Sequence, residues 1–347
     1  MRMTTGWQAV GPTALRRVPL ARRDLRPDDI AVRVDFCGVC HTDLHALTAY
    51  DPHAAEAPLV PGHEFTGVVT GTGPEVTAFS VGDRVAVGNI VDSCGVCAMC
   101  EAGQENFCHS FPTLTYGGTD RQDGGATLGG YSREYVVRDA FAYPLPSGLD
   151  AAAAAPLMCA GVTVWEPLHS LGVGPGSRVA VAGLGGLGHL AVKMAVALGA
   201  TTTVISRTQD KRDDARELGA HELIASTDAE RMAGARDTFD VVIDTISAPH
   251  DLAPYLKLVA MDGTLSLLGY LGPVTVEAMD LLIGRKKLSS TGSGGRPATA
   301  EMLRFCADNG IAADVEVLPS AQVDTALDRL RRNDVRYRFV LDMSDLD

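Results

Sequence analysis

The sequence predicts an α/β protein of two domains, one rich in β-strands and one built on a doubly wound parallel sheet. The chain has 347 residues, which exceeds the usual size of a single domain. Up to residue 150, short apolar runs alternate with Gly- and Pro-containing turns. After residue 151, buried strands alternate with helices, a pattern that is typical of βαβ units.

The first part of the chain contains four segments with strand patterns. They are IAVRVDFCGV at 30–39, FTGVVTGTG at 65–73, DRVAVGNIV at 83–91 and YSREYVVRD at 131–139. Because irregular loops separate them, we expect a partial barrel.

In the second part, strands are predicted at 177–183, 201–207, 239–245 and 263–270, with helices at 186–200 and 210–220. Each helix closes on a glycine, which is a common stop signal. After about residue 288 a helix at 300–310 and a strand at 336–343 follow. We expect this last segment to return to the first domain, so that residues 1–152 and 288–347 form one domain and 153–287 the other.

Composition and charge narrow the possible partners. The net charge is −13 and no long basic run occurs, which argues against nucleic acid and anionic membranes. No signal peptide is expected, because arginines interrupt the first apolar residues, and no apolar stretch reaches the roughly 20 residues that span a bilayer. We therefore expect a cytoplasmic protein, in which clustered cysteines indicate metal binding or catalysis before disulfides.

The tetrapeptide CGVC occurs twice, and its second copy belongs to a run of four cysteines spaced C-x2-C-x2-C-x7-C. The run consists of Cys94, Cys97, Cys100 and Cys108. Four thiolates suit tetrahedral zinc and leave no position open, so a structural zinc is predicted, with Gly95 and Gly103 permitting the turns. An iron–sulfur cluster and unliganded thiols are the alternatives, but a ferredoxin run continues with x3-C-P, which is not found here.

The first copy, Cys37–Cys40, is followed by His63 in PLVPGHEFTG and by Cys159 in PLMCAG. Alone, a C-x2-C pair can be a redox pair, and a single histidine is commonly a core residue. Together the segments supply Cys, His and Cys, the ligand set of a catalytic zinc that keeps one position open. Such a site is a moderate Lewis acid, suited to polarising a carbonyl.

A glycine motif, G-x-G-x-x-G, follows the strand at 177–183 and begins the helix after it. A strand–turn–helix context of this kind favours a dinucleotide site, in which the turn approaches a pyrophosphate at the helix N-terminus. A glycine turn without a ligand is the alternative. The residues predicted to contact the cofactor here are Gly183, Gly185, Gly186, Leu187 and Gly188.

The next strand indicates which dinucleotide binds. NAD sites place a carboxylate at its end, whereas this chain has Ser206, Arg207 and Thr208, with Lys211 one turn further on. Serine and arginine can bind a 2′-phosphate that a carboxylate would repel. We therefore expect NADP(H), and Asp210 is expected to cap the following helix.

The motifs GVCHTD, GHEFTG, the four-cysteine loop and the glycine turn occur in the order seen in zinc-dependent medium-chain alcohol dehydrogenases. The segments GGYSREYVV, PLMCAGVTVWEPL and ALDRLRRNDVRYRFVLDM resemble the cinnamyl-alcohol dehydrogenase-like branch. The resemblance runs over nearly the whole chain. It implies a GroES-like β-rich catalytic domain beside a Rossmann NADP-binding domain, with two Zn²⁺ ions per chain.

The resemblance assigns roles to residues of the catalytic site. It implies that Cys40, His63 and Cys159 bind the catalytic zinc, and that Glu64 can bind the metal when substrate is absent. Cys37 is then expected to be a packed thiol, as is Cys306.

The resemblance also implies three supporting residues on one helix. Asp43 resembles a residue that orients the ligand histidine. Thr42 and His45 resemble a relay that moves a proton between the substrate oxygen and solvent, because a hydroxyl both donates and accepts and a histidine titrates near neutrality.

The expected function is interconversion of aldehydes and primary alcohols with NADP(H), with aldehyde reduction as the direction in the cell. NADPH-dependent reduction of an iminium or conjugated alkene on the same fold is the first alternative, and a non-catalytic NADP(H)-binding sensor is the second. Leu114 and Gly292 stand where the branch often carries aromatic residues, which weakens the case for a cinnamyl substrate. A homodimer is expected from the resemblance.

Overall fold

The computed structural model describes residues 1–53 and 57–347, which form two compact units. The first unit comprises Met1–Cys159 and Gly294–Asp347, and the second comprises Ala160–Ser293. The boundaries that we expected from the sequence lie a few residues earlier in the chain.

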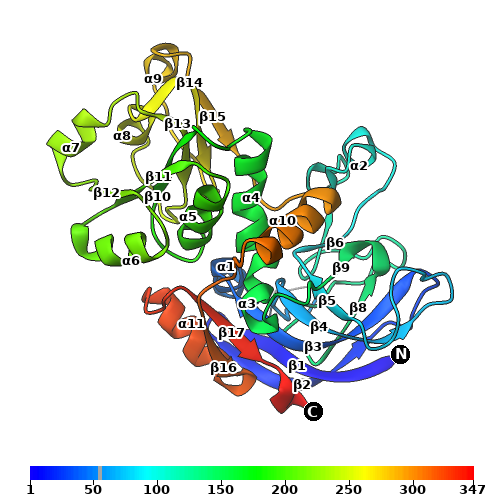
Figure 1. Ribbon diagram of the computed structural model, residues 1–347. Coiled ribbons are helices and arrows are strands. Elements are labelled where there is room, and N and C mark those ends of the chain that lie inside the picture. The colour runs from blue at the N-terminus through cyan, green and yellow to red at the C-terminus, as the bar shows by residue number, and fades with distance from the viewer. Residues whose placement is uncertain (54–56) are drawn as a thin grey trace. The chain divides into compact units, whose positions relative to one another are not determined.

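The first unit is built on a seven-stranded sheet with the strand order β16-β17-β3-β4-β5-β9, on which β8 also pairs with β3 (Figure 1). Two small sheets, β1-β2 and β6-β7, accompany it. The strands are β1 (Arg2–Gly11), β2 (Ala14–Arg22), β3 (Asp29–Val39), β4 (Phe65–Thr72), β5 (Arg84–Val87), β6 (Ile90–Asp92), β7 (Thr113–Leu114), β8 (Glu134–Arg138), β9 (Ala142–Pro144), β16 (Val315–Pro319) and β17 (Arg338–Asp342).

Strand β3 is the axis of this unit. Its first half pairs with β8 and its second half with β17, while β4 lies along its other edge. All three pairings are antiparallel. The last strand of the chain therefore closes onto the first domain, as we expected from the sequence.

The helices of the first unit are α1 (His41–Ala49), α2 (Ala98–Glu101), α3 (Ala151–Ala154), α10 (Arg296–Asp308) and α11 (Val323–Arg331). Apolar side chains of the strands form one core with α1 and α11, which includes Ile30, Phe65 and Phe339. Burial of this size of side chain contributes about 1.5–3 kcal/mol each. This core fixes the ends of β3 and β4, where the site described below begins.

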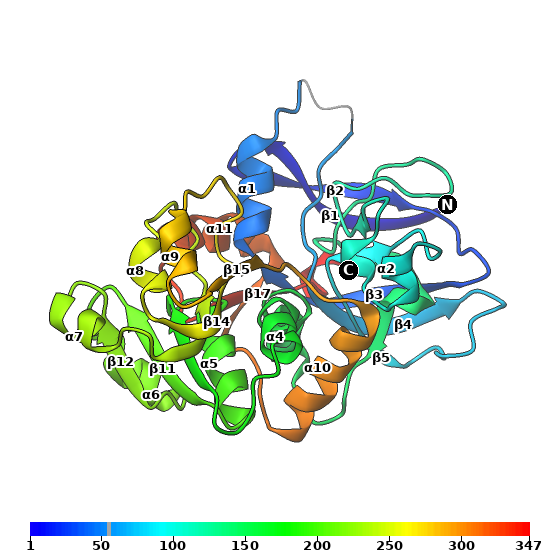
Figure 2. The same cartoon turned by 90° about the horizontal axis from the view of Figure 1, so that it is seen from above.

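The second unit is a six-stranded parallel sheet with the strand order β12-β11-β10-β13-β14-β15, and all six strands are labelled in Figure 1. Figure 2 shows β12, β11, β14 and β15 from above. Its strands are β10 (Arg178–Ala182), β11 (Thr201–Ser206), β12 (Glu222–Ala225), β13 (Phe239–Asp244), β14 (Val259–Leu267) and β15 (Lys287–Ser290). Its helices are α4 (Ala160–Ser170), α5 (Gly188–Ala197), α6 (Arg212–Glu217), α7 (Ala229–Gly234), α8 (Ala253–Leu256) and α9 (Ala278–Leu282).

The strand order reverses between β10 and β13, and ligands of doubly wound sheets bind beyond the carboxyl ends of the strands at such a point. The central strands are runs of Val, Ile and Ala because both faces of a parallel sheet are buried. Helices α5 and α6 are each followed, two residues after their last residue, by a glycine, and the φ values of 87° at Gly199 and 97° at Gly219 suit glycine.

Several segments differ from the expectation, and β12, β15 and β16 were not predicted as strands. The segment 83–91, expected as one strand, is divided into β5 and β6 at Gly88, where a Cβ would lie 2.9 Å from the carbonyl oxygen of Met158. The hairpin of β1 and β2 was not expected, because Arg16, Arg17 and Arg22 interrupt the apolar residues of β2. Among the described residues, no single helix is long and apolar enough to cross a membrane. One bent pair of helices, Ala151–Met158 and Ala160–Ser170, reaches the required length and apolar composition only when the two are counted together.

Candidate active site

Three ligand side chains meet in the first unit. The sulfurs of Cys40 and Cys159 and a ring nitrogen of His63 all lie within 4.8 Å of one another. Cys40 Sγ is 4.0 Å from Cys159 Sγ, and His63 Nε2 is 3.2 Å from the same sulfur. Zn–S bonds of about 2.3 Å and Zn–N bonds of about 2.0 Å place tetrahedral ligands about 3.8 Å and about 3.5 Å apart, so the three residues fit one zinc ion.

Each ligand stands at the end of a regular element. Cys40 follows β3 and caps α1, and His63 lies two residues before β4. Because β3 and β4 pair with Cys37 opposite Phe65, both ligands lie at the same end of this strand pair. Cys159 follows a 3-10 turn, Ala155–Met158, and completes the group. Rigid elements hold metal ligands more accurately than loops do.

Asp43 orients His63, as the resemblance implies. Its Oδ1 lies 3.1 Å from His63 Nδ1, which directs Nε2 toward the sulfurs. Burial lowers the pKa of His63, but the charge and hydrogen bond of Asp43 outweigh it and raise that pKa well above its usual value. The proton on Nδ1 is thus held firmly, and a metal ion would replace the one on Nε2.

The two thiols are paired with each other. The hydrogen bond with Cys159 lowers the pKa of Cys40 well below its usual value, and the same bond raises that of Cys159. The nearby guanidinium of Arg338 helps to lower the pKa of Cys40, and it opposes the rise in the pKa of Cys159 without overcoming it. The site therefore favours a thiolate, which is the form that binds metals.

Glu64 stands apart from the three ligands. Its carboxylate forms a buried ion pair with Arg338 of β17, and it does not belong to the group of converging ligand atoms. Burial acts to raise the pKa of Glu64, and the guanidinium of Arg338 opposes this and favours the charged carboxylate. Gly38 provides the space, since a Cβ there would collide with the carboxylate. In this structure Glu64 is thus an ion-pair partner, and its binding to the metal stays a prediction.

Thr42 and His45 lie on α1, directly after Cys40. The hydroxyl of Thr42 is 3.6 Å from Cys40 Sγ, and both side chains are exposed. Residues three apart on a helix are neighbours, so the two share one face. Thr42 thus lies beside a thiol, and His45 faces solvent one turn further along the helix.

The four-cysteine loop forms a second, closed group. The four sulfurs lie within 4.8 Å of one another, as a single ion requires. Backbone N–H groups of Cys94 and His109 donate to Cys108 and Cys97 at 3.5 Å. The N–H of His109 lowers the pKa of Cys97 to about 6, which favours the thiolate. The turns use Gly95 and Gly103, at φ values of 73° and 71°, as the sequence suggests.

In the second unit, the glycine turn joins β10 to α5 at the point where the strand order reverses. Gly183 has a φ of 89°, and a Cβ at Gly188 would collide with the carbonyl oxygen of Gly183. Gly185 is exposed, and its Cβ would meet nothing within 4 Å. Gly186 and Leu187, which complete the turn, are half-buried. The turn therefore exposes backbone at the N-terminus of α5, where an anion is stabilised.

Residues at the end of β11 lie near this turn. Lys211 Nζ donates to the carbonyl oxygen of Leu184 at 2.7 Å, which ties it to the glycine turn. Ser206 ends β11, and Arg207 after it is exposed. The hydroxyl of Thr208 donates to Asp210 at 2.9 Å. A cationic group and a hydroxyl thus stand where NAD sites carry a carboxylate.

Two residues of the site were missed from the sequence. Arg338 is buried and pairs with Glu64 across 274 positions of the chain. Tyr131 is fully buried and donates to Asp43 across 88 positions. An arginine inside the apolar strand RFVL was a usable signal for the first, because a buried charge needs a partner. A tyrosine in a glycine-rich segment gives no comparable signal.

Comparisons with known proteins agree with this geometry. Residues 26–147 match the alcohol dehydrogenase GroES-like domain, and residues 186–308 match the zinc-binding dehydrogenase family. A probable formaldehyde dehydrogenase of Bacillus subtilis is 44% identical in sequence to this chain, and the match covers 94% of this chain and 93% of the relative.

Two solved structures are also similar. A cinnamyl alcohol dehydrogenase of Sorghum bicolor superposes with a TM-score of 0.94 at 42% identity, covering 98% of both chains. A cinnamyl alcohol dehydrogenase of Helicobacter pylori, solved with NADP(H), gives a TM-score of 0.91 at 31% identity, covering 99% of both chains. The chain therefore belongs to the zinc-dependent medium-chain dehydrogenases, in the branch of the cinnamyl-alcohol dehydrogenases.

Proposed function

We propose that this protein interconverts aldehydes and primary alcohols with NADP(H), and that it works in the cell as an aldehyde reductase. The carrying observation is the group formed by Cys40, His63 and Cys159, which offers three ligands to one ion. Three protein ligands leave a fourth position for substrate, as in catalytic zinc sites. The closed four-cysteine group is the expected structural site.

When bound, zinc supplies a Lewis acid that polarises the substrate oxygen. The chain's own residues prepare the site for it. Asp43 fixes the ring of His63, and Arg338 balances the charge of Glu64 at 0% side-chain exposure. Because these groups are buried, their orientation is set before substrate arrives.

Thr42 and His45 are the proposed proton path. The hydroxyl of Thr42 lies beside Cys40, and His45 is exposed one turn further along α1. A hydroxyl can donate to the substrate oxygen while it accepts a proton from a neighbour, and a histidine exchanges protons with water near neutral pH. This path would protonate the product oxygen during aldehyde reduction.

The coenzyme is proposed to be NADP(H). Ser206 ends β11 and Arg207 follows it, at the place where a 2′-phosphate would lie. The hydroxyl and the guanidinium can both bind a phosphate, and Lys211 adds a cation beside the glycine turn. The Helicobacter pylori relative was solved with NADP(H). Since cells keep NADPH largely reduced, this coenzyme favours aldehyde reduction.

The test is oxidation of NADPH with a panel of aliphatic, terpenoid and aromatic aldehydes, repeated with NADH and with Cys40→Ala. We expect turnover that prefers NADPH and is lost in Cys40→Ala. Half-buried Leu114, in place of a large aromatic residue, leads us to expect turnover beyond cinnamyl aldehydes. Binding of NADPH without turnover of any aldehyde would contradict the proposal and turn attention to imines and conjugated alkenes.

A homodimer and a cytoplasmic location complete the proposal. Strand β15 ends the sheet of the second unit, and the exposed apolar residues Met279, Leu282 and Ile283 precede it. Such an edge and patch suit pairing with a second copy. All eight cysteines are free, which fits a reducing compartment. The homodimer can be tested by light scattering, which should give about twice the 36.5 kDa of one chain. The mass of a single chain would contradict the homodimer.

A further inference from the structure

We propose that Tyr131 is a positioning residue of the metal site, which acts on His63 through Asp43. The inference rests on the proposed zinc site and adds a residue to which no role had been assigned. Its basis is a hydrogen bond of 3.1 Å from the Tyr131 hydroxyl to Asp43 Oδ2.

The carboxylate of Asp43 is fully buried and is surrounded by donors. Oδ1 lies 3.1 Å from His63 Nδ1 and accepts the N–H of Gly62 at 3.1 Å. Oδ2 accepts the N–H of Cys40 at 2.9 Å and the Tyr131 hydroxyl. The backbone donors belong to the two ligand segments, whereas Tyr131 comes from outside them. The tyrosine therefore fixes the carboxylate independently of the ligands.

The backbone sets the position of Tyr131 relative to His63. The segment 129–131 pairs with 60–62 through three N–H···O bonds of 2.7–2.9 Å: Gly129 to Val60, Gly130 to Gly62, and Tyr131 to Pro61. His63 is the next residue of the paired segment. The tyrosine cannot shift along the chain without breaking these bonds.

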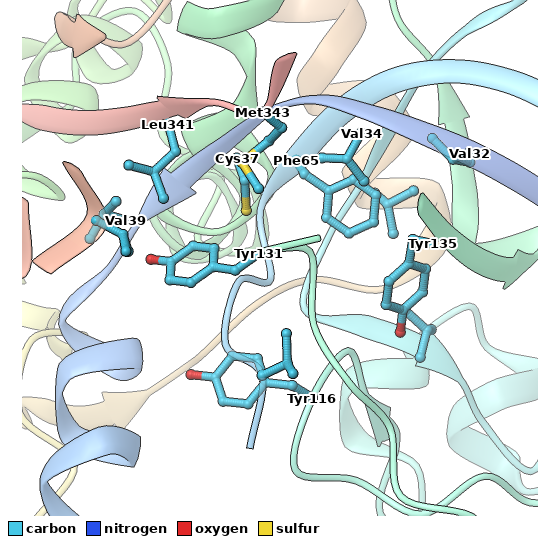
Figure 3. Packing of buried hydrophobic residues seen from close by; sticks show 14 of the residues in the cluster. Val32, Val34, Cys37, Val39, Phe65, Tyr116, Tyr131, Tyr135, Leu341 and Met343 are labelled. Atoms are coloured by element: carbon cyan, nitrogen blue, oxygen red, sulfur yellow. The ribbon is translucent and has the colours of Figure 1, made fainter. Parts of the chain in front are cut away.

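Packing locks the tyrosine ring in place. At Gly62, with a φ of 95°, a Cβ would lie 2.6 Å from the Tyr131 ring and 2.9 Å from Cys37 Sγ. Figure 3 shows Tyr131 beside Cys37 and Phe65, with its hydroxyl directed away from this packed group. Glycine at position 62 thus lets the ring approach the loop that carries His63. The fully buried Cys37 has a packing role here, because it lies beside the Tyr131 ring.

Loss of the hydroxyl should loosen the ligand histidine rather than unfold the protein. Groups that orient metal ligands typically contribute 10- to 100-fold in metal affinity. Burial raises the pKa of Tyr131, which keeps its hydroxyl protonated and able to donate. A hydroxyl that served packing alone would change stability and leave the metal unaffected.

The experiment compares Tyr131→Phe with Tyr135→Phe in the zinc-loaded protein. Tyr135 belongs to the same core, is also buried, and donates its hydroxyl to the carbonyl oxygen of Thr115 at 2.9 Å. Zinc release to a chromophoric chelator is followed over time. In Tyr131→Phe one of the two zinc ions should leave at least tenfold faster than in the wild type, whereas Tyr135→Phe should release both at wild-type rates.

A second measurement tests the route through Asp43. In an Asp43→Ala background, adding Tyr131→Phe should not speed zinc release further, because the contact is already lost. An additional effect of tenfold would overturn the route. Equal release from Tyr131→Phe and Tyr135→Phe would overturn the inference while leaving the proposed function intact. A zinc content that is the same in the wild type and in Cys40→Ser would overturn both, because no zinc would then bind where Tyr131 is proposed to act.

Discussion

At the scale of single residues, neighbours decide what each copy of CGVC does. Cys94 and Cys97 both join the four-sulfur group, but in the first copy only Cys40 reaches a ligand group. Cys37 lies in the core at 0% exposure, and burial raises the pKa of its thiol well above its usual value. A thiol that stays protonated is a poor ligand. Identical tetrapeptides therefore serve different purposes, because the first forms the end of β3 and the second follows β6 in a loop.

Arg207 gives a prediction about coenzyme choice. Replacing it with Glu should lower kcat/KM for NADPH by roughly 10- to 100-fold, because a charge-assisted bond contributes about 1.5–3 kcal/mol. The value for NADH should change little. Steady-state kinetics with both coenzymes measure this, and Arg216→Glu, the same charge change at an exposed position of α6, is the control. Equal losses with NADPH and NADH would show that Arg207 does not recognise the phosphate.

The sequence predicts the metal ligands well, because cysteine and histidine in clusters have few other uses in a reducing compartment. It does not predict Arg338 or Tyr131, because each acts on a residue far away in the chain. Their partners follow from the pairing of β17 with β3 and of the segment 129–131 with 60–62. Such pairings are tertiary facts that local patterns do not contain.

At the scale of elements, the turn between β10 and α5 separates two uses of glycine. A Cβ at Gly188 would collide with the carbonyl oxygen of Gly183 inside the turn, whereas at Gly185 it would meet open space. Gly188 is therefore needed for the fold of the turn, whereas the open space at Gly185 leaves room for the proposed pyrophosphate. In the G-x-G-x-x-G motif both positions are simply glycine, so the motif alone does not distinguish their roles.

This difference can be tested with two alanine variants. Gly188→Ala should lower the stability of the second unit by about 1–3 kcal/mol, because the added methyl overpacks the turn. Gly185→Ala should keep wild-type thermal stability but bind NADPH at least tenfold more weakly. Thermal melts and NADPH fluorescence titrations measure the two effects. A stable Gly188→Ala protein, or a Gly185→Ala protein with normal NADPH affinity, would refute the assignment.

Prediction of elements succeeds where one physical pattern dominates. The central strands β10 and β13 are largely apolar, and glycines follow the helices α5 and α6; both features are local. The hairpin of β1 and β2 is missed because polar residues lie along both its strands. The break after β5 is missed because it depends on Met158, which is distant in the sequence.

At the scale of the whole molecule, two chemistries share one chain in separate units. The first unit holds both metal groups, and the second holds the glycine turn and the residues beside it. The change from alternating strands to βαβ units marks this division in the sequence. The return of the last strand to the first unit depends on its pairing with β3, which pattern alone suggests but does not prove.

The central claim is that one chain holds two zinc ions of different kinds. The most direct test is the zinc content of protein purified without chelator, measured by mass spectrometry for the wild type, Cys40→Ser and Cys97→Ser. We predict about two zinc ions per wild-type chain, about one in Cys40→Ser with the fold preserved, and loss of the structural ion in Cys97→Ser. A wild-type content of about one zinc or none per chain would contradict the account.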